Sequence, residues 1–257
     1  MIPKTIHYCW FGRNPKPELA EKCIKSWKKF CPDYEIIEWN EDNFDISSCS
    51  LYVRQAYEAK KWAFVTDYVR LKVVYDEGGI YLDTDVELIK SLDALLGYDA
   101  YFGFEDGIHI ATGLGFGAVK GAQIVFEMMQ DYEEIPFISE DGKLDLTTCP
   151  QRNTEVFVRH GLIQDDTRQN LDDGILVLPT EVLCPLSYST GKLRKTRNTI
   201  SIHHFSATWK TKEDKAREKK RADALKKDYL IHTPNRIGKK LLGDTRYEEL
   251  KRIFGKN

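Results

Sequence analysis

The sequence contains no long apolar segment. No stretch of about 18 apolar residues occurs in it, so no membrane-spanning helix is predicted. The amino-terminal segment 1–7 has too short an apolar run for a signal peptide. Internal repeats and low-complexity stretches are also lacking. These absences favour a cytoplasmic globular protein.

Metal-binding cysteine spacings and nucleic-acid-binding motifs are absent as well. No C-x-x-C pair occurs among the six cysteines, which we interpret as reduced, mostly structural thiols: Cys9, Cys23, Cys31, Cys49, Cys149 and Cys184. No stripe of basic and aromatic residues is present, and no known reader motif accompanies the basic residues. Nucleic acid is therefore not expected as a partner.

Charge is distributed unevenly along the 257 residues, although the formal net charge is only -2. Residues 210–257 hold 16 Lys or Arg against 8 Asp or Glu, and the remainder holds 22 against 32. We expect a catalytic domain over 1–209 and a basic helical C-terminal extension over 210–257. The extension is either solvated or a peripheral contact with the cytoplasmic face of the membrane. The oligomeric state is left open.

The pattern of apolar residues alternates between strand and helix periods, which favours an α/β sandwich with a mainly parallel central sheet. Residues 54–77 form the strongest helical segment, without Pro or Gly, and Gly78-Gly79 ends it. Strands are expected at 2–10, 34–39, 80–89, 102–104, 115–119 and 175–178, and a further helix at 18–30.

Two aspartates, Asp83 and Asp85, follow the glycine pair. In a continuous strand both carboxylates lie on one face, with Cα atoms roughly 7 Å apart. Such a pair can hold a hard divalent cation that carries diphosphate oxygens. The alternative is a strand end that emerges into solvent.

The preceding helix places Ala63, Asp67 and Arg70 on one face. This face can lie beside the aspartate strand, because Gly78-Gly79 folds the chain back at once. These three residues and Trp62 are then candidates to bind sugar and ribose hydroxyls. The alternative is that Asp67 and Arg70 form a plain i,i+3 ion pair.

The runs 62–70 (WAFVTDYVR) and 75–85 (YDEGGIYLDTD) resemble the signature of glycosyltransferase family 32, the sugar transferases with a DxD motif. The opening 2–12 (IPKTIHYCWFG) resembles its bacterial capsular and exopolysaccharide branch. The likeness covers about residues 1–120. The glucosyltransferase domains of clostridial toxins are more distantly similar.

The resemblance implies a GT-A type fold, a nucleotide-diphosphate sugar as donor and Mn²⁺ or Mg²⁺ as cofactor. Asp85 is then the direct metal ligand, and Asp83 contacts the ribose or sugar and a metal-bound water. Asp67 and Arg70 match the clamp on the donor sugar. Trp10 matches an aromatic residue that stacks on the uracil ring, unless it is a core residue that ends the first strand.

A second group of residues lies at 200–209 (ISIHHFSATW). An apolar strand that ends in paired histidines can return an imidazole to the metal. Relatives also carry a Trp after such a histidine pair, so Trp209 is assigned to the donor site. We expect His204 to be the metal ligand and His203 its neighbour; otherwise both are surface residues.

Two loops are assigned less specifically. Glu105 and Asp106 either bind sugar hydroxyls or are turn residues, and residues 151–153 are candidates for the acceptor cleft.

The function expected from the resemblance is retaining transfer of a hexose, from UDP-galactose or UDP-glucose, to a saccharide or lipid-linked saccharide acceptor in bacterial surface polysaccharide synthesis. GDP-mannose is the alternative donor. Other readings are an effector that glycosylates proteins and an inactive carbohydrate-binding protein with a transferase fold. A haloacid-dehalogenase phosphatase is disfavoured, because Glu87 stands where that motif has Thr or Val.

Overall fold

The structure is a computed structural model that describes residues 1–206, and these form one compact unit. The expected basic helical extension over 210–257 lies outside the described residues. Among the described residues, no helix has the length and apolar character needed to span a bilayer. The helices and strands are β1 Thr5–Cys9, α1 Glu18–Phe30, β2 Glu35–Trp39, the 3₁₀ turn η1 Ile46–Ser48, α2 Leu51–Glu58, α3 Trp62–Glu77, β3 Gly79–Tyr81, β4 Val86–Leu88, the 3₁₀ turn η2 Asp93–Leu95, β5 Ala100–Gly103, β6 Phe116–Ala118, α4 Gln123–Glu133, α5 Cys149–Arg159, β7 Gln169–Leu171, β8 Ile175–Leu178, α6 Thr180–Leu183 and β9 Ser201–His203.

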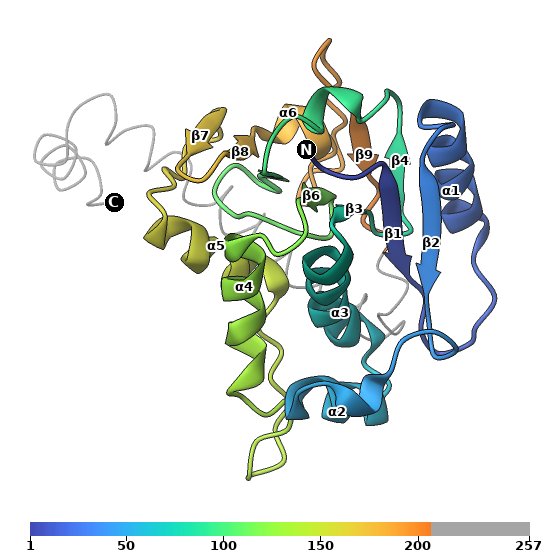
Figure 1. Ribbon diagram of the computed structural model, residues 1–257, viewed down its shortest axis with the longest axis vertical. Helices are drawn as coiled ribbons and strands as arrows, with labels where there is room; N and C mark the ends of the chain where they lie inside the picture. Colours follow the sequence, from blue (N-terminus) through green and yellow to red (C-terminus); the bar gives the residue numbers. More distant parts are fainter. Residues whose placement is uncertain (207–257) are drawn as a thin grey trace, which may run out of the picture. The chain divides into compact units, whose positions relative to one another are not determined.

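A seven-stranded sheet organises residues 1–206, in the order β2-β1-β3-β6-β5-β8-β7 (Figure 1). Strand β1 is parallel to β2 and β3, and β5 is parallel to β8. Strand β6 is antiparallel to both β3 and β5, and β7 is antiparallel to β8. Five strands therefore share one direction, which confirms the expected α/β class and mainly parallel central sheet.

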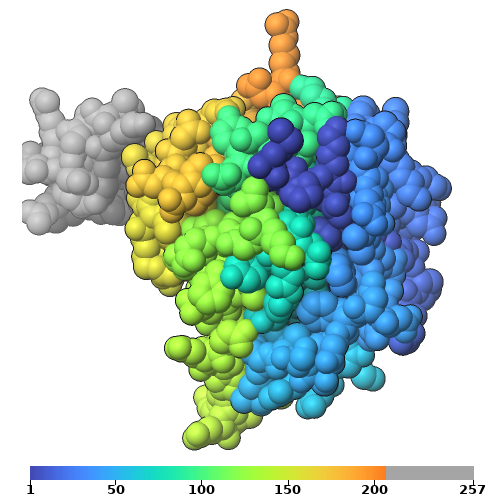
Figure 2. Space-filling view, viewed as in Figure 1, coloured from blue at the N-terminus to red at the C-terminus, as the bar shows by residue number. Residues whose placement is uncertain are grey.

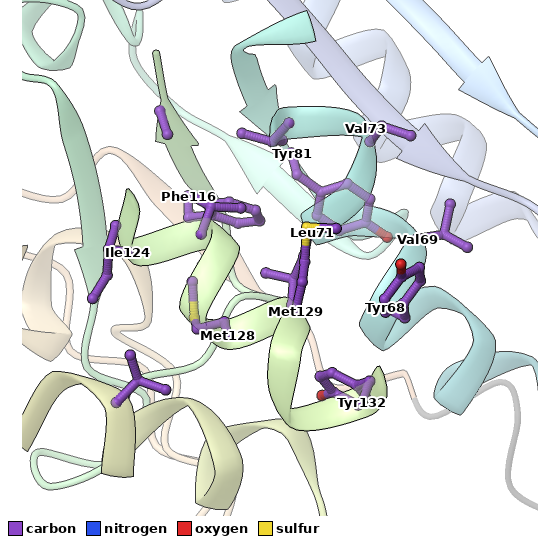
Figure 3. Packing of buried hydrophobic residues seen from close by; sticks show 14 of the residues in the cluster. Tyr68, Val69, Leu71, Val73, Tyr81, Phe116, Ile124, Met128, Met129 and Tyr132 are labelled. Carbon is purple, nitrogen blue, oxygen red and sulfur yellow. The ribbon is translucent and has the colours of Figure 1, made fainter. Parts of the chain in front are cut away.

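Two apolar layers cover the two faces of the sheet. On one face, α2, α3, α4 and α5 bury a cluster that includes Tyr68 of α3, Met128 of α4 and Phe116 of β6 (Figure 3). On the other face, α1 and a small β4-β9 ribbon bury a second cluster, with Trp27 at its centre. Because strand side chains alternate, neighbours such as Tyr101 and Phe102 belong to different clusters.

The helix expected over 54–77 is two helices. Helix α2 ends at Glu58 and α3 begins at Trp62. Between them Lys60 has φ 56°, and the N–H of Lys61 donates to the carbonyl of Ala56. This is the hydrogen bond of a helix C-terminal motif that usually contains glycine. A lysine takes the left-handed position here, so the break has no glycine signal in the sequence.

The strand expected over 80–89 is also two strands, which belong to different sheets. Strand β3 stays in the central sheet, whereas β4 pairs with β9. The indole N–H of Trp27 donates to the carbonyl of Val86 at 2.7 Å, which fixes β4 against α1. Asp83 and Asp85 lie in the connection between the strands, so the prediction that one continuous strand aligns them is wrong.

Two connections extend outward from this unit. Figure 2 shows the yellow-green segment between α4 and α5 at the bottom of the view and the orange segment before β9 at the top. Leu144 and Leu146 in the first segment are exposed.

Candidate functional site

Two aspartates and one histidine converge at one end of β3. Asp83, Asp85 and His203 each offer a ligand atom, and these atoms lie within 4.8 Å of one another. The aspartates follow β3, and His203 is the last residue of β9. The predicted convergence of the two carboxylates is therefore present, but the turn between β3 and β4 creates it.

Asp85 is the most strongly engaged of the three residues. Its Oδ1 lies 3.3 Å from Nε2 of His203, and its Oδ2 accepts hydrogen bonds from the backbone N–H and the hydroxyl of Ser206. Burial alone raises the pKa of a carboxyl group, but the contacts with His203 and Ser206 hold the pKa of Asp85 well below its usual range. Asp85 is therefore ionised at neutral pH.

The carboxylate of Asp83 lies against a different set of groups. Its Oδ1 accepts a hydrogen bond from the hydroxyl of Tyr81 at 2.9 Å and lies 3.4 Å from Nη2 of Arg70. Burial raises the pKa of Asp83, and Arg70 opposes this rise while Asp85 adds to it. Asp83 thus links Asp85 and His203 on one side to the guanidinium of Arg70 on the other.

Gly113 packs directly against the side chains of Asp83 and Arg70. Its carbonyl accepts the backbone N–H of Asp83. A Cβ at this position would lie 2.4 Å from Oδ2 of Asp83 and 3.0 Å from Nη1 of Arg70. Only glycine therefore fits without moving the carboxylate or the guanidinium.

Asp67 and Arg70 lie where the helical spacing predicted. Nη2 of Arg70 lies 3.0 Å from Oδ1 of Asp67, and both side chains are largely buried, with exposed fractions of 4% for Arg70 and 12% for Asp67. Burial raises the pKa of Asp67 to about 6, against the opposing effect of Arg70. The pair reaches Asp83, so it is a part of the site and not an isolated surface ion pair.

The structure corrects the choice between the two histidines. His203 faces the aspartates, whereas Nε2 of His204 lies 2.8 Å from Oε2 of Glu87. Successive residues of an extended chain project to opposite sides, so only one histidine of an adjacent pair can face the aspartates. His203 therefore replaces His204 in the candidate metal site.

The remaining predicted residues are placed less specifically. Trp10 follows β1, its indole N–H donates to the carbonyl of Asn14, and its ring is half-buried with Nζ of Lys16 5.8 Å away. Ala63 lies in the first turn of α3. Trp209 lies outside the described residues. The nucleotide-binding roles of these three residues stay predictions.

The sequence reasoning assigned no specific contact to Ser206, Tyr81 or Gly113, although the family resemblance places the loop 112–115 beneath the donor sugar. Tyr81 had a signal, since it stands two residues before Asp83 and strand alternation places both on one face. The particular contacts of Gly113 and Ser206 had no local signal, because they are made with residues more than 25 positions away in the sequence.

The donor set of the site fits a hard divalent cation. Two carboxylates and one imidazole are ligands that Mn²⁺ accepts, and Mg²⁺ favours the oxygens. Nε2 of His203 faces Asp85 and is therefore the nitrogen available to an ion, whereas Nδ1 is buried. Although burial lowers the pKa of a histidine, Asp85 raises the pKa of His203 well above its ordinary value. A proton on the His203 ring would therefore supply part of the positive charge that a bound cation supplies beside Asp85.

Residues 17–102 match the family model described as the glycosyltransferase sugar-binding region containing the DXD motif. The matched region includes Asp67, Arg70, Asp83 and Asp85, and the resemblance to the DxD sugar transferases is confirmed. The match ends before β9, so it does not include His203.

Two characterised relatives are similar over part of their length. Inositol phosphoceramide mannosyltransferase 3 of Schizosaccharomyces pombe is 30% identical over 140 residues, which are 53% of this chain and 38% of the relative. Subversion of eukaryotic traffic protein A of Legionella pneumophila is 26% identical over 111 residues, 33% of this chain and 17% of that protein. The chain thus spans well under half the length of either relative.

Two solved glycosyltransferase structures are similar to part of this chain. The PaToxG glycosyltransferase has a TM-score of 0.46 and 19% identity, with 62% of this chain and 69% of that chain covered. The galactosyltransferase LgtC has a TM-score of 0.38 and 15% identity, with 69% and 74% covered.

Proposed function

We propose that this chain is a metal-dependent glycosyltransferase that moves a hexose from a nucleotide-diphosphate sugar to a saccharide acceptor. The observation that carries this proposal is the convergence of Asp83, Asp85 and His203 beside the buried Asp67–Arg70 pair. The family match over residues 17–102 supports it independently.

In this proposal Asp83, Asp85 and His203 hold Mn²⁺ or Mg²⁺. The bound ion supplies fixed positive charge where negative charge builds on the leaving diphosphate. Ser206 and Tyr81 orient the two carboxylates through the hydrogen bonds described above. Preorganised ligands of this kind require little rearrangement when the substrate binds.

The other residues of the site bind the donor. Asp67 and Arg70 offer an acceptor and several donors of hydrogen bonds within one buried pair, which suits the hydroxyl groups of a sugar. Trp10 follows β1, which pairs with β3, and its half-buried ring is the candidate to stack on a nucleobase. Transfer with retention at the anomeric carbon belongs to the same proposal.

The donor, acceptor and setting are finer proposals. We favour UDP-glucose or UDP-galactose as donor and bacterial surface polysaccharide synthesis in the cytoplasm as setting. The mannosyltransferase relative supports GDP-mannose as the alternative donor. A second candidate is an effector that transfers the sugar to a protein acceptor, and the similarity to a Legionella protein named for the subversion of eukaryotic traffic supports an effector role.

The experiment compares substitutions of Asp85 and Glu87, two carboxylates that are two residues apart in the sequence. Wild-type protein, Asp85→Asn and Glu87→Gln are incubated with Mn²⁺ and UDP-glucose, UDP-galactose or GDP-mannose, and release of the nucleoside diphosphate is measured. We expect Asp85→Asn to lose at least about 100-fold in rate, because it removes a charged group at the reacting diphosphate. Glu87→Gln is the matched control and is expected to stay near the wild-type rate, since among residues 1–206 the Glu87 carboxylate pairs with His204 and Lys22 and lies outside the Asp83–Asp85–His203 group.

Two outcomes contradict the proposal. One is equal activity of Asp85→Asn and wild-type protein. The other is a wild-type protein that neither hydrolyses any of the three donors nor is stabilised against heat by them in the presence of Mn²⁺. Chelation of the ion with EDTA should abolish the wild-type activity, and added Mn²⁺ should restore it.

A further inference from the structure

Glu105 is a carboxylate that the description of the site above leaves without a role. It follows β5 in the sheet, where Phe104 belongs to the first apolar cluster and Gly103 lies against Leu114 and Leu183 of the second. Gly103 thus faces the side of the sheet that carries the β4-β9 ribbon, and hence Asp85 and His203. Glu105 lies in a bend just beyond this strand, and its carboxylate is close enough to His203 and Asp83 to interact electrostatically with both.

The hairpin that starts at Glu105 leads directly to Gly113, which packs against Asp83. The backbone N–H of Glu105 donates to the carbonyl of His109 at 2.8 Å, and Phe104 pairs with Ile110. Three residues further on, the carbonyl of Gly113 accepts the N–H of Asp83. The segment that follows the hairpin is therefore hydrogen-bonded to Asp83, and Glu105 begins the hairpin next to this connection.

The side chain of Glu105 has no hydrogen bond and no ion pair among the described residues, although it is half-buried. Its neighbour Asp106 is fully used within the turn: it accepts the N–H groups of Ile108 and His109 and contacts the ring of His109. An unpartnered, half-buried carboxylate is costly, and the fold offers no reason for it. Burial raises the pKa of Glu105 and His203 opposes that rise, which agrees with its place near the ion site.

We propose that Glu105 binds hydroxyl groups of a sugar in this site. The inference rests on the proposed glycosyl transfer. A carboxylate accepts hydrogen bonds from hydroxyls and repels phosphate, so a sugar suits Glu105 and the diphosphate does not. The sugar belongs either to the donor or to the acceptor.

The test compares Glu105→Ala and Glu105→Gln with Asp106→Asn as matched control. The probes are UDP with Mn²⁺, the nucleotide sugar that wild-type protein hydrolyses fastest among UDP-glucose, UDP-galactose and GDP-mannose, and that donor with a saccharide acceptor. We expect Glu105→Ala to lose about 10- to 100-fold in turnover, the effect of one charge-assisted hydrogen bond. Glu105→Gln should retain more, binding of UDP with Mn²⁺ should not change, and Asp106→Asn should behave as wild type.

The assays distinguish the two sources of the sugar. If Glu105 binds the donor sugar, Glu105→Ala weakens binding of the nucleotide sugar and slows its hydrolysis by water. If it binds the acceptor, hydrolysis is unchanged and KM for the acceptor rises. Wild-type rates in both assays, or weakened binding of UDP with Mn²⁺, would overturn the role while leaving the proposed transferase intact. A wild-type protein that is inert toward every donor would overturn both.

Discussion

Two histidine–carboxylate pairs lie side by side on the β4-β9 ribbon, and they differ in almost every physical respect. The pair of His204 and Glu87 is closer, at 2.8 Å, and is shared with the exposed Lys22. The pair of His203 and Asp85 is longer, at 3.3 Å, yet its side chains are only 11% and 13% exposed, against 25% and 20% for the outer pair. We call these the inner pair, His203–Asp85, and the outer pair, His204–Glu87.

The difference between them lies in charge and not in distance. The negative charge of the outer pair is balanced, because Lys22 lies within 3.0 Å of Glu87. The inner pair has a second carboxylate, Asp83, beside it, and burial makes that surplus negative charge costly. A divalent cation removes this cost, so the inner pair is suited to a metal site and the outer pair to structure.

The largest expected contrast comes from removing each histidine in turn. His203→Ala should lower Mn²⁺ affinity by more than the about 10- to 100-fold typical of outer-shell partners. His204→Ala should leave it nearly unchanged. Titration of Mn²⁺ monitored by calorimetry and by activity measures both, and equal losses in the two variants would contradict the assignment.

A second contrast concerns the backbone behind Asp83. Gly113→Ala places a methyl group into Asp83 and Arg70, and we expect transfer to fall roughly 10- to 100-fold because the clamp moves. Gly97→Ala is the control, since nothing lies within 4 Å of its added Cβ. Steady-state rates and thermal unfolding of both variants separate lost geometry from lost folding. A fully active Gly113→Ala variant would show that the close packing of Gly113 against Asp83 and Arg70 is not needed for activity.

A third prediction concerns the free energy of unfolding that is lost when the buried carboxyl group of Asp67 ionises. The pKa of Asp67 is about 6 in the folded chain, above its ordinary value of 3.8. The folded state therefore holds this proton to higher pH than the unfolded state, and the contribution to stability is complete below about pH 4 and lost as pH rises through about 6. Relative to Asp67→Asn, wild-type protein should lose on the order of 1–3 kcal/mol of unfolding free energy between those values.

Urea unfolding of both proteins at several pH values measures that loss. If the unfolding free energies of wild type and Asp67→Asn depend on pH in the same way, the pKa of Asp67 is not raised in the folded protein. Activity is expected to move the opposite way, with the Asn variant more stable but slower, as is common where a site carries buried charge.

The smallest effect is expected at the outer pair. Lys22→Ala removes an exposed partner of Glu87, and the change in unfolding free energy should be below about 1 kcal/mol. The effect should shrink further at high salt, because exposed charges are screened. A large loss of transferase activity in this variant would mean that the two pairs are coupled.

Several features of the site could be predicted from local pattern. Helical spacing was sufficient to pair Asp67 with Arg70, and the glycine pair after Glu77 correctly marked the reversal that brings α3 beside β3. The DxD motif located the acidic centre. The β-α-β order of residues 2–39 was readable as well, because apolar periodicity is a local property.

Other features depended on contacts distant in the sequence. The prediction of one strand over 80–89 is wrong, because Trp27 and β9 draw β4 away from β3. The break at Lys60 had no glycine to mark it. The choice of His204 over His203 could not be corrected from sequence, since either histidine can face inward until the register with β4 is known.

The amino-acid sequence by itself determined the class of the fold, the acidic motif and the cation on the preceding helix, since each follows from short-range periodicity and residue chemistry. Tertiary structure decided which histidine joins the aspartates, how a turn aligns them, and that Glu105 is left without a partner. The physical reason is that burial and pairing of charge depend on segments more than 100 residues apart, such as β4 and β9, whose register no local pattern specifies.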